Sequence, residues 1–166
     1  MKTAFIIIDV QNILVETGFE TKQLLEKISY LQEQARKQQI EIIYIQHIET
    51  KEALTSEDWQ LSPLLKRQSD EKVFQKRYNS MFKETGLKEY LDQQGIEKLV
   101  LCGMQTEYCV DTSVKVAFEH GYKLVVPEGT VTTFDGDDIP AEMINEFYEN
   151  IWDERFADVL DYKTIF

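Results

Sequence analysis

The chain has 166 residues, 43% of them hydrophobic, and a net charge of −12 at neutral pH. This length and composition predict one globular domain with a sizeable core. The negative charge argues against nucleic acid and anionic membrane surfaces as partners, because both attract clustered lysine and arginine. We therefore expect a small-molecule substrate, with no nucleic acid and no membrane.

The N-terminal segment enters an isoleucine-rich run at once, from Thr3 to Ile8. This start is too short for a signal peptide and lacks a small-residue cleavage site, so we expect a cytoplasmic protein. No apolar run reaches the length needed to span a membrane. The first run is typical of a strand buried on both faces of a parallel sheet, and Asp9 follows it directly.

Strands and helices alternate along the rest of the chain. The apolar spacing predicts helices over residues 24–35, 85–95, 110–120 and 140–151, and strands over 40–45, 71–75, 99–103, 122–126 and 156–160. In the last helix we expect a buried stripe made of Met143, Ile144, Phe147 and Ile151. The alternation predicts an α/β fold, in which a mostly parallel sheet carries helices on both faces.

Cys109 lies where the strand before Gly103 gives way to a helix. The N–H groups and partial positive charge at a helix N-terminus favour thiolate, which predicts a lowered pKa and a better nucleophile. The alternative is a small buried residue that packs under the helix. Cys102 lies inside the apolar strand, and the spacing of the two cysteines matches neither a redox pair nor a zinc motif.

Residues 46–70 lack clean periodicity, and a connection of this length is usually a functional loop. His47 directly follows the second strand, at the edge where parallel sheets bind ligands, and Trp59 lies further along the loop. His47 could line a pocket or bind a metal. The only other histidine, His120, is expected to interact with the dipole at a helix C-terminus.

Three chemically complementary residues each follow a predicted strand: Asp9, Lys76 and Cys109. The carboxyl ends of parallel strands lie at one edge of a sheet, so these side chains are expected to share a pocket. A carboxylate, an ammonium group and a thiol in one pocket are typical of an activated nucleophile.

These residues and their neighbours also carry a resemblance. The chain resembles the isochorismatase-like cysteine hydrolases, which include nicotinamidases, N-carbamoylsarcosine amidohydrolases and streptothricin hydrolases. The resemblance covers nearly the full length, and its marks are Ile8-Asp9-Val10-Gln11-Asn12, Lys76 with Ser80 and Phe82, and Gly103-Met104-Gln105-Thr106-Glu107-Tyr108-Cys109-Val110. The last of these segments is the most specific.

The resemblance implies a single isochorismatase-like hydrolase domain over residues 1–166. Its fold would be a three-layer αβα, Rossmann-type arrangement with a six-stranded sheet of order 3-2-1-4-5-6. Asp9, Lys76 and Cys109 would form the catalytic triad. A cis peptide bond between Met104 and Gln105 would turn the N–H of Gln105 toward the pocket, where it would form an oxyanion hole with the N–H of Cys109.

Two features depart from the family pattern. The nicotinamidases bind a metal through an Asp-x-His pair and further histidines in the long loop, whereas this loop has Gln46-His47 and no second histidine. We therefore expect no metal and no cofactor. After the fifth strand, Glu128-Gly129 stands where the family usually has Asp-Ala, which affects local pocket detail rather than the triad.

The favoured function is hydrolysis of a C–N bond in a small amide-like substrate through a thioester on Cys109. The candidate substrate-binding residues are Gln11, His47, Trp59 and Tyr108, and the resemblance implies a homo-oligomer, either a dimer or a tetramer. One alternative is an isochorismatase-type vinyl-ether hydrolase, in which Asp9 acts as the acid and no thioester forms. Another is a non-catalytic binding protein on the same fold.

Overall fold

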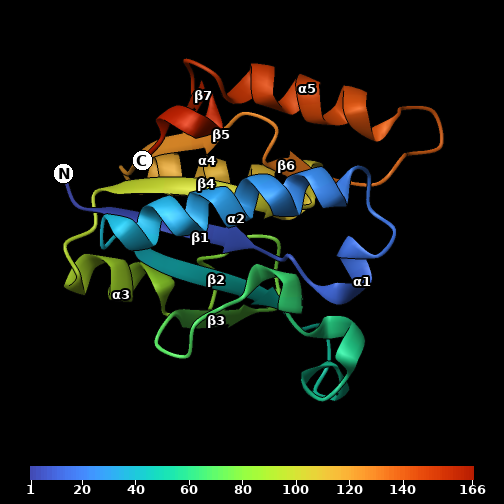
Figure 1. Cartoon of the computed structure of the whole chain (residues 1–166), viewed down its shortest axis with the longest axis horizontal. Coiled ribbons are helices and arrows are strands. Elements are labelled where there is room, and N and C mark those ends of the chain that lie inside the picture. The colour runs from blue at the N-terminus through green and yellow to red at the C-terminus, as the bar shows by residue number, and fades with distance from the viewer.

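The computed structural model describes residues 1–166, as a central sheet with helices on both sides (Figure 1). The strands of the main path have the order β3-β2-β1-β4-β5-β7, and every neighbouring pair is parallel. This confirms the order 3-2-1-4-5-6, with β7 as the sixth strand. The additional strand β6 (Val131–Thr132) pairs with the end of β4, beyond the residues that β5 covers.

Most elements lie within a few residues of their predicted positions. The main strands are β1 (Thr3–Ile8), β2 (Glu41–His47), β3 (Lys72–Lys76), β4 (Lys98–Met104), β5 (Lys123–Pro127) and β7 (Asp158–Leu160). The α-helices are α1 (Asn12–Val15), α2 (Thr21–Lys37), α3 (Leu87–Gln93), α4 (Asp111–Glu119) and α5 (Ala141–Trp152). Three short 3₁₀ turns, at Glu52–Leu54, Glu57–Trp59 and Pro63–Leu65, organise the long loop that periodicity left undescribed.

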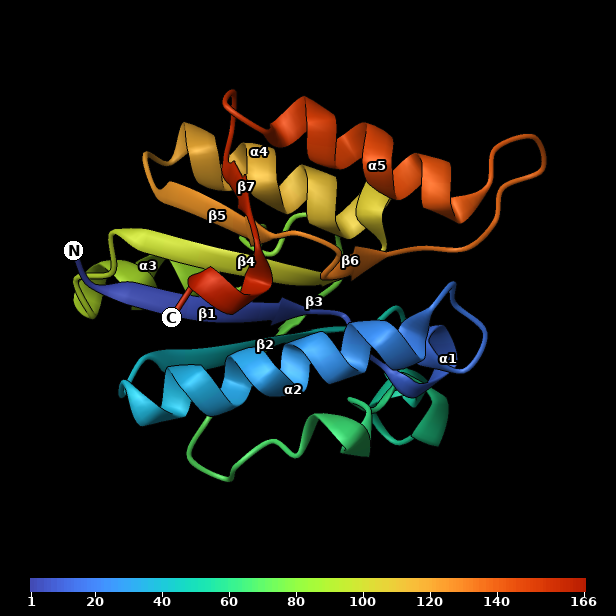
Figure 2. The same ribbon diagram turned by 45° about the horizontal axis from the view of Figure 1, so that its top comes forward.

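The alternation of side chains along β1 builds a core on each face of the sheet. Phe5 and Ile7 pack in the cluster beneath α2, whereas Ile6 and Ile8 pack in the cluster formed with α3, α4 and the end of α5. Figure 2 shows α2 on one side of the sheet and α4 with α5 on the other. Because β1 is buried on both faces, its sequence is continuously apolar and does not alternate apolar with polar residues.

The predicted stripe of α5 is only partly correct. Met143 and Phe147 are 59% and 60% exposed, whereas Trp152 is fully buried. The Trp152 indole packs in the core and donates a hydrogen bond from Nε1 to Asp111 Oδ1 at 2.9 Å. Helical spacing predicts an apolar face on α5, but the face that packs against the sheet is the one that carries the large Trp152 indole.

The turn after β1 depends on a close approach between two central strands. Gly103 of β4 pairs with Ile8 of β1 and has a φ of +126°. A Cβ added at Gly103 would lie 2.0 Å from the Ile8 carbonyl oxygen, so only glycine fits here. Asp9 and the segment that leads to Cys109 therefore leave the sheet side by side.

No helix in the structure is both long enough and apolar enough to cross a bilayer. The cytoplasmic location stays a prediction.

Candidate active site

The side chain of Lys76 lies at the centre of a buried polar cluster. Its ammonium nitrogen is 2.7 Å from Asp9 Oδ2, 3.1 Å from Cys109 Sγ and 3.0 Å from His47 Nδ1. Lys76 is the last residue of β3, and its side chain is completely shielded from solvent. The structure thus brings together the three residues of the predicted triad and adds His47 as a further neighbour.

Asp9 follows β1 in a left-handed backbone conformation, with a φ of +50°, which aspartate tolerates better than most residues. Its carboxylate is buried: Oδ2 accepts the hydrogen bond from Lys76, whereas Oδ1 has no hydrogen-bond partner. Burial raises the pKa of Asp9 above its ordinary value, and the charge of Lys76 opposes that rise. Such a carboxylate can accept a proton from a neighbouring thiol.

Cys109 lies in a π-helical turn, Thr106–Val110, that leads into α4. The expectation of a lowered thiol pKa is wrong. Burial, reinforced by the negative charge of Asp9, raises the pKa of Cys109 to about 12 despite the opposing effect of Lys76. The resting thiol is therefore protonated at neutral pH, and its activation requires that a base take the proton.

The peptide bond between Met104 and Gln105 is cis, as the resemblance implies. The carbonyl of Gln105 then accepts hydrogen bonds from the N–H groups of Tyr108 and Val110, at 3.1 and 3.2 Å. These bonds close the backbone turn on both sides of Cys109. The oxyanion hole formed by the N–H groups of Gln105 and Cys109 stays a prediction.

Asn79 is a further neighbour of the thiol, and the sequence alone does not identify it. Its Oδ1 lies 3.8 Å from Cys109 Sγ, and its side chain is otherwise exposed. The carbonyl of Asn79 accepts a hydrogen bond from Ser113 of α4 at 3.4 Å. Its position three residues after Lys76 is the one sequence feature that could have pointed to a role in the site. An asparagine in a polar turn is, however, more often a surface residue.

The predicted substrate contact of Gln11 needs correction. Gln11 is fully buried, and its amide donates to the carbonyls of His47 and Trp59 and accepts from the N–H of His47. Its polar atoms are therefore committed to the backbone at the end of β2 and at Trp59 of the long loop. Gln11 braces that loop from behind, because a buried amide is stable only when its hydrogen bonds are satisfied.

The other candidate substrate-binding residues occupy different positions around the cluster. The rings of His47 and Trp59 lie 6.0 Å apart, centre to centre, so Trp59 covers the loop side of His47. Tyr108 precedes the thiol residue and is 53% exposed. A contact between either aromatic side chain and a substrate stays a prediction.

The side chains of Asp9, His47 and Cys109 offer ligand atoms that all lie within 4.8 Å of one another. A carboxylate, an imidazole and a thiolate would suit zinc. However, the Lys76 ammonium lies within hydrogen-bonding distance of all three groups. The native cluster is therefore built around a lysine cation and does not fit a resident metal ion.

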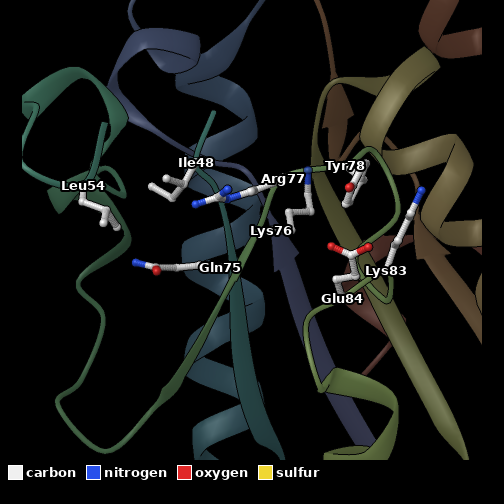
Figure 3. A pocket seen from close by; sticks show the side chains of 8 residues that line it. All are labelled: Ile48, Leu54, Gln75, Lys76, Arg77, Tyr78, Lys83 and Glu84. Atoms are coloured by element: carbon white, nitrogen blue, oxygen red, sulfur yellow. The ribbon is translucent and has the colours of Figure 1, made fainter. Parts of the chain in front are cut away.

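A cavity of about 310 Å³ lies beside the end of β3, next to this cluster (Figure 3). Because the Lys76 side chain is shielded from solvent, only its backbone can border the cavity. Figure 3 shows Lys76 pointing away from Gln75, which follows from the alternation of side chains along a strand. On the opposite wall, Lys83 lies 4.0 Å from the centre of the Tyr78 ring. The cavity therefore lies next to the buried cluster at the end of β3, where the backbone of Lys76 borders it.

Comparison with known proteins identifies the family. Residues 3–163 match the model described as Isochorismatase domain, so the chain belongs to the isochorismatase family. It is 28% identical over 153 residues to streptothricin hydrolase from Streptomyces noursei, covering 84% of this chain and 55% of that protein. It is also 30% identical over 93 residues to maleamate amidohydrolase from Pseudomonas putida, covering 56% of this chain and 41% of that protein.

A solved structure supports the same assignment. The fold is similar to that of an isochorismatase from Pseudomonas putida KT2440, with a TM-score of 0.92 and 28% identity over 99% of this chain and 90% of that one. The protein is therefore an isochorismatase-family hydrolase with amidohydrolases among its relatives. The chain spans about half the length of streptothricin hydrolase.

Proposed function

We propose that this protein hydrolyses a C–N bond of a small amide-like substrate through a thioester on Cys109. The observation that carries the proposal is the buried Lys76 ammonium, which contacts both Asp9 and Cys109. The similarity to maleamate amidohydrolase supports C–N bond cleavage as the reaction type.

The first half of the reaction forms the acyl-enzyme. Asp9 takes the proton from the Cys109 thiol as sulfur attacks the carbonyl carbon of the substrate. The backbone N–H groups of Gln105 and Cys109 stabilise the oxyanion of the tetrahedral intermediate. When this intermediate collapses, the C–N bond breaks, Asp9 returns its proton to the leaving nitrogen, and a thioester remains on Cys109.

The second half restores the enzyme. Asp9 takes a proton from water, whose oxygen attacks the thioester carbonyl. The C–S bond then breaks, the carboxylic acid leaves, and the proton held by Asp9 returns to the Cys109 sulfur. The balance is one amide and one water consumed, with one acid and one amine produced.

The raised pKa values of Cys109 and Asp9 fit this sequence. Transfer of the thiol proton to Asp9 moves a negative charge from oxygen to sulfur without changing the net charge of the buried cluster. The Lys76 ammonium contacts both atoms and stabilises the charge before and after the transfer. A free thiolate beside an ionised Asp9 would instead add an uncompensated buried charge.

A panel of small amides, with isochorismate included, tests the proposal through release of amine or ammonia and of vinyl-ether products. On an amide that wild type cleaves, Cys109→Ala is expected to lower kcat by at least about 10³-fold. The matched control is Cys102→Ala, since Cys102 is fully buried in β4 and lies outside the cluster. Full turnover by Cys109→Ala would overturn the thioester mechanism. Such turnover on isochorismate would favour the vinyl-ether reaction, with Asp9 as the acid.

A further inference from the structure

His47 contacts Lys76 but has no role in the proposed mechanism. An ammonium group carries three protons and no lone pair, so it can only donate hydrogen bonds. The Lys76 nitrogen has three close neighbours, one for each of its protons: Asp9 Oδ2 at 2.7 Å, Cys109 Sγ at 3.1 Å and His47 Nδ1 at 3.0 Å. A hydrogen bond from Lys76 to Nδ1 requires Nδ1 to be unprotonated, with the ring proton on Nε2.

We propose that His47 is a positioning residue, a neutral imidazole that accepts the third Lys76 proton and so aims the other two at Asp9 and Cys109. The inference rests on the proposed function, because it assigns His47 to the same cluster. It differs from the expected role of His47 as a substrate contact, since the ring acts through Lys76.

Contacts to the backbone and to the ring of His47 hold its side chain in place. The backbone N–H and carbonyl of His47 are both bonded to the buried amide of Gln11, at 2.8 and 3.0 Å. His47 also pairs with Lys76 in the β2–β3 register, and its ring lies against Trp59. A ring held in this way can orient a flexible lysine side chain, whose four-carbon stem otherwise allows many rotamers.

The charged groups that face His47 determine when it can play this role. They are Lys76 and Asp9 on the cluster side, with the Cys109 thiol beside them, and Glu49, whose Oε1 lies 3.9 Å from Nε2. Burial lowers the pKa of His47, Lys76 lowers it further, and Asp9 and Glu49 oppose the shift. His47 is therefore neutral above a pKa that lies below the ordinary value of about 6.5. When pH falls through that pKa, the imidazole becomes charged and the Lys76 contact is lost.

Nitrogen NMR of the imidazole rings tests this state without any substrate. The chain has only two histidines, so His120→Asn assigns the spectrum. We expect the Nε2–H tautomer of His47 at neutral pH, a midpoint below about 6.5, and a higher midpoint in Lys76→Met. An Nδ1–H tautomer, or a wild-type midpoint above that value, would overturn the proposal. The wild-type spectrum decides this even if Lys76→Met fails to fold.

Kinetics of two His47 variants provide the second test. An asparagine places its Oδ1 near the position of Nδ1, so His47→Asn retains an acceptor for Lys76, whereas His47→Leu does not. We expect His47→Leu to lower kcat by about 10²-fold or more with little change in KM, and His47→Asn to recover at least about a tenth of wild-type kcat. The acid limb of kcat/KM in His47→Asn should also lose the imidazole titration.

A rise in KM alone in His47→Leu would show that the ring contacts the substrate and would overturn the positioning role.

The thioester mechanism and the positioning role of His47 fail in different ways. Full turnover by Cys109→Ala together with the expected tautomer would overturn only the thioester mechanism, whereas the wrong tautomer together with an inactive Cys109→Ala would overturn only the role of His47.

Discussion

Replacing Asp9 by asparagine should make Cys109 more reactive toward alkylating agents while it abolishes catalysis. Asparagine keeps the shape of the side chain and removes its negative charge. The ligand atoms of Asp9 and Cys109 lie within 4.8 Å of each other. At 4.8 Å and an effective dielectric constant of about 20, their repulsion would be about 3.5 kcal/mol, or roughly 2.5 pKa units. In Asp9→Asn the pKa of Cys109 should therefore fall well below its wild-type value of about 12.

The assay is the rate of iodoacetamide alkylation as a function of pH, measured on separated peptides by mass spectrometry. At pH about 8, iodoacetamide should alkylate Cys109 at least about 10²-fold faster in Asp9→Asn than in wild type, because the thiolate fraction increases as the pKa of Cys109 falls by roughly 2.5 units. Cys102 is the internal control, since burial raises the pKa of its thiol in both proteins. Turnover of a cleaved amide should nevertheless be lost, because no base remains to accept and return the proton.

Slower alkylation in Asp9→Asn than in wild type would refute this reasoning. It would mean that Asp9 already holds the thiol proton in the resting protein, so that the cluster contains a preformed thiolate.

Three further predictions follow from the same geometry. In His47→Asn, which lacks the imidazole, kcat/KM should fall as pH drops through the raised pKa of the Asp9 carboxyl, because the mechanism needs that carboxylate ionised. The acid limb of this variant should lie above the ordinary carboxyl value of 3.8, and an acid limb at or below that value would contradict the role of Asp9 as base. Gln11→Leu removes three hydrogen bonds, two to His47 at the end of β2 and one to Trp59 in the long loop, and should lower the free energy of unfolding by about 3 kcal/mol in urea titrations. The partly exposed Gln60→Leu is a milder control, and equal effects of the two variants would show that Gln11 does not stabilise this junction specifically. Lys76→Ala removes the ammonium group from the position among Asp9, His47 and Cys109, so this variant should bind Co²⁺. The bound Co²⁺ should give a thiolate charge-transfer absorption band that wild type lacks, and the same band in wild type would show that Lys76 does not exclude metal.

The homo-oligomer expected from the resemblance stays a prediction, and light scattering on the purified protein measures it directly. The exposed side chains of Ile139, Met143 and Phe147 lie around a mostly apolar cavity of about 350 Å³, which Glu107 of the turn before α4 also lines. A monomer at micromolar concentration would contradict the expectation.

The order of the main sheet strands and the meeting of Asp9, Lys76 and Cys109 could be predicted from the sequence. Each residue ends or follows a strand or strand-turn segment of a parallel sheet, and such a sheet delivers all its carboxyl ends to one edge. Topology alone therefore places the three side chains together, and the family resemblance supplies the strand order.

The chemical state of the cluster could not be predicted in the same way. A helix terminus and a nearby lysine both favour thiolate, but burial and Asp9 outweigh them at Cys109. That balance depends on how deeply each atom is buried, which spacing along the chain does not encode. Gln11 is a similar case, because its amide is satisfied by backbone groups 36 and 48 residues away.

The most direct test of the thioester mechanism is to quench a reaction during turnover in acid and measure the intact protein mass. With an amide that the protein cleaves, wild type should carry an added acyl mass that maps to the Cys109 peptide and disappears with hydroxylamine. Cys109→Ser should release product at least about 10³-fold more slowly. Undiminished turnover by Cys109→Ser, with no acyl mass on wild type at any quench time, would contradict the account.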